Sequence, residues 1–519
     1  MSGLALLLLV SATGYALSRL LALPSVPLLL LSGAGMAALG GVEPAGLSGL
    51  LELGLAFLVF SAGLEVAPHR AGPQLRAAFS VGVLQFLLLG ALGYLAARLL
   101  DLDRLGALYL ALALAASSTL VVVRLVRYRR QAYDPVGRLV VGVLLLQDLL
   151  VTLALPLVIS LPEGAGAVVA ALGGVLLLTG AAVLLQGALG LLVRRRVELH
   201  REEGLLMVVA LLFVFGAAAR ALGLPVVTGA FLAGFALSGL SVSGEVRGHT
   251  ASLHDFFVAV FFTALGATVG IPSVAVLAQA VPLALVVVLL TPPLVALVVE
   301  AMGSSARTGI AAGLLLAQTS EFSLVVALHG AAAGSLPSET LAALVLVTAA
   351  TMLLTPFLSE DVVVWRLLHL HPAGRRRPAS AVPPRDHVVL LGCGSNGSAV
   401  LDLLLLQGRD VLIVDDDPTI VARVAEAGVD AVRGDATVPA VLDAAGVERA
   451  TVVVSTLRRV EDNRPVLERA RGRPVVVRGF SAEDARWIEE LGGIPVVYAE
   501  AAAEEFLRWF DEESGLAGR

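Results

Sequence analysis

Residues 137–161 read GRLVVGVLLLQDLLVTLALPLVISL, and from Leu139 to Leu161 they form an apolar run with Gln147 and Asp148 near its middle. A helix needs about twenty apolar residues to cross a bilayer, so this run is long enough to span one. Asp148 follows Arg138 by 10 residues, or about 15 Å of helix, which places it near the bilayer centre. A carboxylate at that depth costs several kcal/mol unless it is paired, so Asp148 is a candidate ion- or proton-binding residue.

The composition outside this run also indicates a membrane protein. Hydrophobic residues make up 57% of the 519-residue chain, charged residues only 15%, and the mean hydropathy is +0.89. Apolar segments continue from Leu4 to Leu358, and we count thirteen candidate spans in a predicted transmembrane domain of residues 1–360. The formal charge is −6, and the membrane part has few arginine clusters, so nucleic acid is excluded as a partner.

Arginine is unevenly distributed between the loops that join the spans. The loops after the third, fifth, seventh, ninth and eleventh spans carry most of it, including Arg70, Arg127, Arg194 and Arg247. Arginine-rich loops stay on the cytoplasmic side. We therefore expect a multi-pass protein of the cell (inner) membrane whose N-terminus lies outside and whose C-terminal domain is cytoplasmic.

The apolar region contains an internal repeat. SRLLALPSVP from Ser18 recurs as ARALGLPVVT from Ala219, an offset of 201 residues, and two further pairs of segments match within two residues of that offset. These pairs are VFSAGLEV with FFTALGAT and AASSTLVVV with QTSEFSLVV. The offset covers seven spans, an odd number, so the second copy has the opposite orientation in the membrane. Such inverted repeats are typical of secondary transporters, whose substrate site lies near the bilayer midplane.

Polar clusters lie in the middle of the fifth and twelfth spans. The first is Ser117, Ser118 and Thr119, and the second is Thr319, Ser320 and Glu321. Such clusters favour local unwinding, which frees carbonyl groups and half-helix ends to hold ions. Another interpretation is that the hydroxyls bond back to the preceding turn or join neighbouring helices. Glu321 favours the first interpretation, because a midplane carboxylate can be stabilised by the positive N-terminal end of a half-helix.

A proton and a dehydrated monovalent cation can compete for the oxygens of Asp148, which is the minimum requirement for an antiporter. A structural carboxylate paired with an arginine is disfavoured, because no basic residue lies in the central part of any span. A potassium channel is a second interpretation, but the chain has no TVGYG-like filter and too many spans for a pore module. A membrane-bound dehydrogenase is a third, but no substrate domain is evident. We therefore expect a transporter and no enzyme activity.

The last third of the chain has a different composition. A Pro- and Arg-rich linker, residues 361–385, precedes a predicted Rossmann-like domain at 386–500 and a C-terminal tail at 501–519. The strand HVVLL leads into GCGSNG with Gly392, Gly394 and Gly397, and the strand DVLIV then ends at Asp415. Glycines allow a pyrophosphate to approach a helix N-terminus, and the acid binds ribose hydroxyls. Cys393 in this loop is expected to fill a tight turn rather than to sense redox state.

With these motifs, the membrane region resembles the cation:proton antiporter-2 family, and above all its Kef-type potassium-efflux branch. LLQDLL around Asp148, GLPVVTGAFLAGFALSG from Gly223, FFTALG from Phe261 and AQTSEFSLVV from Ala317 carry the resemblance. It implies about thirteen helices with two crossed, broken helices at the fifth and twelfth spans. It implies that Asp148 binds the transported cation and the proton, that Gln147 replaces an acid of electrogenic relatives, and that Ser117–Thr119 and Thr319–Glu321 form the crossover.

The chain departs from this family in two places. Some relatives carry a lysine in the eleventh span, whereas residues 274–299 contain no base. A single aspartate without that lysine favours electroneutral one-for-one exchange of K⁺ for H⁺, with Na⁺ as the alternative cation. The stretch VSGEVRGHTASLHD at 242–255 has little of the acidic segment of glutathione-gated members, so the resemblance does not extend to glutathione control.

The tail resembles the potassium-transport nucleotide-binding domain, also called KTN, TrkA-N or RCK. GDAT at 434–437 and Asn463 add to the glycine loop. The resemblance implies NAD(H) or an adenine nucleotide (AMP or ATP) as a regulatory ligand, and it implies a homodimer. The expected cofactor-binding residues are Gly392, Gly394, Ser395, Asn396, Gly397, Asp415, Asp416, Gly434, Asp435 and Ala436.

Overall fold

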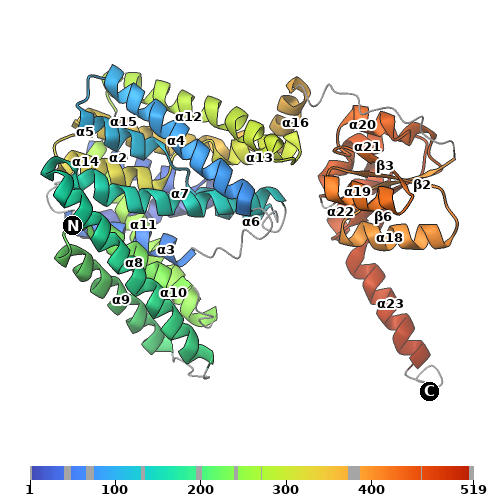
Figure 1. Ribbon diagram of the computed structural model, residues 1–519, viewed down its shortest axis with the longest axis horizontal. Coiled ribbons are helices and arrows are strands. Elements are labelled where there is room, and N and C mark those ends of the chain that lie inside the picture. Colours follow the sequence, from blue (N-terminus) through green and yellow to red (C-terminus); the bar gives the residue numbers. More distant parts are fainter. Residues whose placement is uncertain are drawn as a thin grey trace. The chain divides into compact units, whose positions relative to one another are not determined.

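Figure 1 shows the protein as a computed structural model, which describes residues 3–39, 48–65, 75–129, 135–194, 201–238, 244–270, 272–371, 386–457 and 459–513. The chain forms two compact units. The first comprises residues 1–298 and 308–364, and the second comprises residues 299–307 and 365–519. Most of the predicted linker, residues 372–385, and the last residues, 514–519, lie outside the described ranges.

The first unit is built from helices. They are α1 (Gly3–Leu21), α2 (Ser25–Ala38), α3 (Ser48–Glu65), α4 (Leu75–Leu99), α5 (Arg104–Leu114), α6 (Thr119–Tyr128), α7 (Pro135–Ser160), α8 (Ala165–Arg194), α9 (Arg201–Ala221), α10 (Val226–Ser238), α11 (Gly244–Val269), α12 (Val274–Ala301), α13 (Ala306–Leu316), α14 (Glu321–Ala332) and α15 (Ser338–Leu358). A 3₁₀ turn at Leu161–Glu163 separates α7 from α8, and α16 (Asp361–Leu370) follows α15.

Contacts divide these helices into two groups. The crossing group consists of α1, α2, α3 and α8 to α11, in which α2 packs against α11 and α3 against α10. The broken-helix group consists of α4 to α7 and α12 to α15, in which α4 packs against α5 and α7, and α14 against α5 and α15. α13 joins it through the bond from Ser117 to Leu316, and α12 through the bond from Thr340 to Gln279. The α4 and α7 ribbons lie side by side in Figure 1.

Glycines let the helices of the crossing group approach closely. A Cβ on Gly33 of α2 would lie 2.0 Å from the Thr263 carbonyl oxygen, and one on Gly234 of α10 would lie 2.0 Å from that of Phe60. Gly33 and Gly234 are separated by the 201-residue offset of the repeat. The α2–α11 and α3–α10 contacts are therefore equivalent contacts of the two repeat copies.

Two helices are broken at the predicted positions. α5 ends at Leu114 and α6 begins at Thr119, while α13 ends at Leu316 and α14 begins at Glu321. The second pair is bent by 41° at its break. The polar clusters therefore unwind the backbone, as predicted, instead of bonding back within continuous helices.

The number of membrane crossings stays a prediction. In the described residues, seven segments are long and apolar enough to cross a membrane if α5 and α6 are taken together as one, or eight if α13 and α14 also form one span. α2 and α10 are apolar but only 14 and 13 residues long, shorter than the roughly twenty residues of a full crossing.

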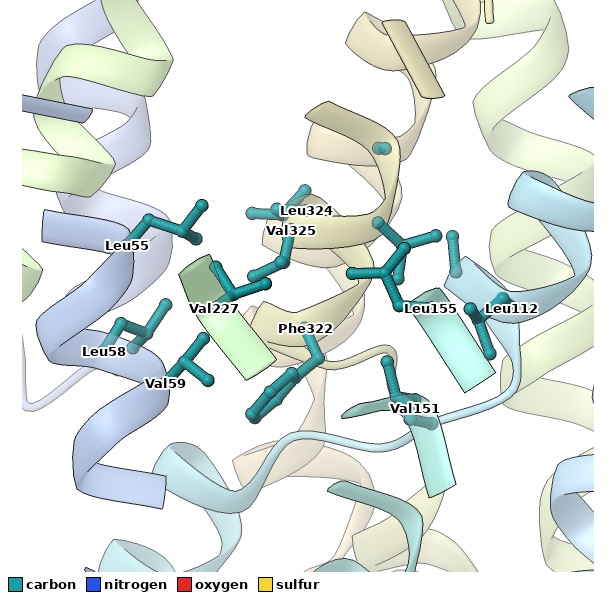
Figure 2. Packing of buried hydrophobic residues seen from close by; sticks show 14 of the residues in the cluster. Leu55, Leu58, Val59, Leu112, Val151, Leu155, Val227, Phe322, Leu324 and Val325 are labelled. Carbon is teal, nitrogen blue, oxygen red and sulfur yellow. The ribbon is translucent and has the colours of Figure 1, made fainter. Parts of the chain in front are cut away.

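An apolar core surrounds the second break. Phe322, one residue after Glu321, lies near Val59 of α3, Val227 of α10 and Val151 of α7 in Figure 2, and all four side chains are buried in the main core cluster. This packing fixes the first turn of α14 and keeps apolar groups beside the polar break.

The second unit contains a six-stranded sheet of order β3-β2-β1-β4-β5-β6, and every adjacent pair is parallel. This order is that of a dinucleotide-binding Rossmann fold. The strands are β1 (Val388–Leu391), β2 (Val411–Asp415), β3 (Asp430–Arg433), β4 (Val452–Ser455), β5 (Val475–Gly479) and β6 (Ile494–Val497). The helices are α18 (Ser395–Leu406), α19 (Pro418–Glu426), α20 (Pro439–Ala444), α21 (Arg464–Arg469), α22 (Ala482–Glu490) and α23 (Tyr498–Glu513), with 3₁₀ turns at Val447–Arg449 and Val460–Asn463.

Candidate ion site and nucleotide-binding loop

Asp148 lies on α7, directly beside the break between α5 and α6. Its side chain is fully buried, and its Oδ2 accepts a hydrogen bond of 2.7 Å from the Thr119 hydroxyl. Its Oδ1 is buried without a hydrogen-bond partner among the described residues. One oxygen of the carboxylate is thus held in place while the other is left to bind a ligand.

The neighbouring Gln147 holds the unwound backbone. Its Oε1 accepts a hydrogen bond of 3.0 Å from the Ser117 amide, and its Nε2 is buried without a partner in the described ranges. The Ser117 hydroxyl donates to the carbonyl oxygen of Leu316, the last residue of α13, at 2.8 Å. Ser117 therefore joins one broken helix to the other, which confirms that the two breaks cross.

Glu321 begins α14 and contacts the start of the other half-helix. Its Oε1 accepts a hydrogen bond of 3.3 Å from the Leu120 amide, in the first turn of α6. Ser118 caps the same helix by accepting from the Val121 amide at 3.4 Å. The predicted placement of Glu321 at the positive end of a half-helix is confirmed. Its Oε2 is buried without a partner in the described part of the chain.

Thr319 and Ser320 form hydrogen bonds that hold the second break in place. The Thr319 amide donates to Thr351 Oγ1 at 3.2 Å, and its hydroxyl donates to Thr348 Oγ1 at 3.0 Å. Ser320 caps α14 through a capping box with Ser323. Thr319 thus bonds to α15 rather than to Asp148, so the eight predicted residues do not form one ring around a single point.

Sequence analysis missed three residues of this region. Gln85 of α4 donates to Ser117 Oγ at 2.9 Å, and Thr348 and Thr351 of α15 hold Thr319. For the threonines, the available signal was their spacing, because Thr348, Thr351 and Thr355 recur at helical spacing within an apolar span.

The arrangement fits a dehydrated monovalent cation. Buried oxygens without a partner among the described residues include Asp148 Oδ1, Glu321 Oε2, Gln85 Oε1 and Gln318 Oε1. Buried polar atoms normally have a partner, so several orphaned oxygens beside the two breaks indicate a ligand. Oxygen atoms are the donors that alkali cations need in place of water, and the carboxylates provide the negative charge.

The glycine loop of the second unit has the geometry of a phosphate-binding turn. Gly392 has a φ of +81°, which favours glycine. A Cβ on Gly397 would lie 2.1 Å from the Gly392 carbonyl oxygen, whereas one on Gly394 would meet no atom within 4 Å. Gly392 and Gly397 are thus needed for the turn, while Gly394 keeps space open at the N-terminus of α18.

The predicted acid lies beside this loop. Asp415 ends β2, and its Oδ2 accepts a hydrogen bond of 2.6 Å from the Cys393 amide. The Gly434 amide donates to the Asp415 carbonyl oxygen at 3.0 Å, which places the GDAT segment at the same edge of the sheet. Asp416 directly follows Asp415, Ser395 and Asn396 begin α18, and Asp435 and Ala436 follow Gly434. The structure therefore gathers the predicted loop, acid and GDAT segment at the carboxyl ends of β1, β2 and β3.

Comparisons with known proteins agree with this division. The model of the family "Sodium/hydrogen exchanger, transmembrane" matches residues 5–360, and that of the TrkA-N domain matches residues 388–499. The glutathione-regulated potassium-efflux system protein KefC of Salmonella schwarzengrund is 28% identical over 430 residues, which are 79% of this chain and 67% of that protein. KefC of Klebsiella pneumoniae is 28% identical over 432 residues, 81% of this chain and 69% of its own.

Among solved structures, the sodium proton antiporter MjNhaP1 from Methanocaldococcus jannaschii is similar with a TM-score of 0.50 and 15% identity. The likeness covers 70% of this chain and 97% of that one, and it supports the fold of the membrane part. The predicted combination of a helical exchanger domain and a Rossmann-like domain is confirmed. The chain thus belongs to the sodium/hydrogen exchanger family, as a Kef-type transporter with a C-terminal TrkA-N domain, and it is not an enzyme.

Proposed function

We propose that this chain exchanges K⁺ for H⁺ across the cell membrane by alternating access, without net charge movement. The observation that carries the proposal is the buried Asp148 carboxylate beside the crossed helix breaks, with one oxygen held by Thr119 and the other without a partner in the described residues. The potassium-efflux names of the relatives favour K⁺. The sodium proton antiporter that shares the fold makes Na⁺ the alternative.

In this mechanism a cation and a proton take turns on Asp148. When the site faces the side with more K⁺, the cation displaces the proton, and Asp148 with neighbouring oxygens replaces part of the hydration shell. When the broken-helix group moves relative to the crossing group, the site faces the other side and the proton returns. Thr119 keeps the carboxylate oriented in both states through the bond to Oδ2.

Glu321 has a different role in this proposal. Its Oε1 is held by the Leu120 amide, and the N-terminal end of α6 stabilises its negative charge. We infer that Glu321 stays ionised and anchors the crossing, while Asp148 is the group that exchanges its proton. One carboxylate that changes state, next to the neutral Gln147, gives an exchange of one cation for one proton.

Proton flux driven by cation gradients in everted vesicles tests this function. K⁺, Na⁺, Rb⁺ and Li⁺ are compared in the same preparation, and the proposal expects the largest flux with K⁺. Flux with Na⁺ alone would establish the alternative. Absence of flux with all four cations, from protein shown to be inserted and folded, would refute antiport.

We further propose that the TrkA-N domain binds NAD(H) or an adenine nucleotide and alters the transport rate without consuming it. The supporting geometry is the open space at Gly394, the α18 N-terminus and the nearby Asp415. Titration calorimetry on the full-length protein with NAD⁺, NADH, AMP and ATP tests it. Because a Cβ on Gly394 meets no atom, Gly394→Asp should remove binding while the domain stays folded. No binding of any of the four by the wild type would refute the regulatory role.

The same proposal includes a homodimer in the inner membrane, with the N-terminus outside and the TrkA-N domain in the cytoplasm. The arginine distribution supports this orientation. Cysteine labelling from either side at Ser2 and at Ser380 in a Cys393→Ser background would test it, and light scattering in detergent would give the oligomeric state.

A further inference from the structure

A cavity of about 580 Å³ lies in the first unit. It is bounded by the end of α1, the start of α2, one face of α6, part of α11 and the end of α15. α1, α2 and α11 belong to the crossing group, whereas α6 and α15 belong to the broken-helix group. The two walls of the cavity therefore come from the two groups of helices that alternating access would move.

The polar part of the cavity is suited to an anion. Arg19 and Arg124 line it, and both side chains are exposed. Arg124 Nη1 donates to Ser25 Oγ at 3.2 Å, across the cavity from α6 to α2. Ser25 begins the 14-residue α2, and no side chain caps this helix. Pro27 in the first turn has no amide hydrogen, so the amides that α2 offers a ligand are those of Ser25 and Val26, two residues that line the cavity together with the arginines.

Other lining groups define the balance of charge and polarity. Asp255 and Glu360 contribute two carboxylates, and Arg129 contributes a third guanidinium, whose Nη2 donates to the Pro356 carbonyl oxygen at 2.9 Å. The arginines outnumber the acids by three to two. His254 Nδ1 is buried there without a partner among the described residues, so it can also hydrogen-bond a ligand.

The rest of the cavity is apolar. Its lining includes Leu120 and Val121 of α6, Val258 of α11 and Phe357 of α15. A simple inorganic anion would leave these side chains without a partner. A ligand that joins an anionic group to an apolar body would cover both parts of the cavity.

We propose that this cavity binds a phosphate monoester or diester attached to an apolar group. Arg124 and Arg19 contact the phosphate together with the first amides of α2, and the apolar part lies against Leu120, Val258 and Phe357. Two sources have this chemistry: an anionic phospholipid of the surrounding leaflet and a soluble organic phosphate.

Occupancy slows exchange, an effect that rests on the proposed antiport. A phosphate bound to Arg124 on one wall and to the α2 amides on the other joins the two groups of helices. The ligand also lies against Leu120, whose amide holds Glu321, so it occupies space directly beside the first turn of α6.

Binding is measured on the purified full-length protein, independently of transport. Native mass spectrometry follows retention of phosphatidylglycerol after transfer from mixed phosphatidylcholine–phosphatidylglycerol vesicles. Thermal unfolding in phosphatidylcholine alone follows the effect of added phenyl phosphate, a soluble monoester that carries an apolar group. The variants are Arg124→Gln, Arg19→Gln and, as a matched control, Arg127→Gln, which changes an exposed arginine of α6 that does not line the cavity.

The wild type and Arg127→Gln are expected to bind the phosphate probe equally. Arg124→Gln and Arg19→Gln are each expected to bind about tenfold more weakly, as for loss of one charge-assisted hydrogen bond. Retention of phosphatidylglycerol alone identifies the lipid as the ligand, and stabilisation by phenyl phosphate identifies a soluble phosphate. Equal binding by all four proteins, or no binding of either probe by the wild type, would overturn the site even if exchange is confirmed. If binding is confirmed while exchange is absent, the antiport proposal fails and the site stands.

Discussion

Asp148→Asn should abolish exchange and leave the fold intact. The substitution keeps the shape of the side chain, and the amide oxygen can still accept from the Thr119 hydroxyl, which now donates to Oδ2 at 2.7 Å. A hydrogen bond to a neutral acceptor contributes about 1 kcal/mol less than one to a carboxylate. Removal of a buried charge without an ion-pair partner offsets that loss. The free energy of unfolding should therefore change by no more than about 1 kcal/mol.

The effect on the cation is much larger. Two unit charges 4 Å apart attract by about 4 kcal/mol at an effective dielectric constant of about 20. Loss of this attraction weakens cation binding by roughly three orders of magnitude. The amide also has no carboxyl proton to exchange, so both halves of the cycle fail.

The assay is cation-dependent proton flux in everted vesicles, with protein amount and thermal unfolding measured in the same preparation. Glu339→Gln, which neutralises an exposed acid at the start of α15, is the matched control and should transport as the wild type does. Asp148→Glu should retain part of the activity, because it keeps the charge but shifts the oxygens. Wild-type flux in the folded Asp148→Asn protein would refute the assignment of Asp148 as the carrier.

Three further predictions concern charge, packing and the tail. Exchange of one cation for one proton should give no current on a supported membrane, so a current that scales with the cation gradient would contradict electroneutrality. Gly33→Ala should destabilise the protein by about 1–3 kcal/mol, because a Cβ there would lie 2.0 Å from the Thr263 carbonyl oxygen. Gly35→Ala is the control and should not destabilise it, because a Cβ there meets no atom within 4 Å. Equal thermal unfolding of the two variants would exclude the close helix crossing. Burial of the Cys393 thiol, and to a smaller extent the nearby charge of Asp415, raises the pKa of this thiol. The thiol should therefore stay protonated and react slowly with iodoacetamide at neutral pH. Fast labelling of the folded protein would show that the turn is open.

The features predicted from sequence are those that depend on spacing along the chain. The 201-residue offset predicted two equivalent copies, and the Gly33 and Gly234 crossings follow it. The polar clusters predicted both helix breaks, and the order of strand, glycine loop, helix, strand and Asp415 predicted the start of the Rossmann fold. Each of these signals is local or periodic, so the sequence alone contains it.

The features that were missed depend on which helices become neighbours. Nothing near Thr348 in the sequence shows that α15 packs beside the second break, so its bond to Thr319 was not predicted. The same is true of Gln85 and Ser117, which belong to different helices. The hydroxyl of a threonine in an apolar span can donate a hydrogen bond to the preceding turn as readily as to another helix. Only the packing of the helices decides between these two outcomes.

The two breaks show why one carboxylate is expected to exchange its proton. Thr119 donates to Asp148, 29 residues further along, and Thr319 donates to Thr348, also 29 residues further along. A threonine at each break therefore donates to the helix that follows, but the acceptor is an acid at the first break and a neutral hydroxyl at the second. The second copy does carry an acid, Glu321, but its Oε1 is held by the Leu120 amide at the N-terminal end of α6. A proton on Glu321 would weaken that bond and the favourable interaction with the helix end. Asp148 is thus the carboxylate whose proton can be exchanged for a cation without weakening a contact that holds the two breaks together.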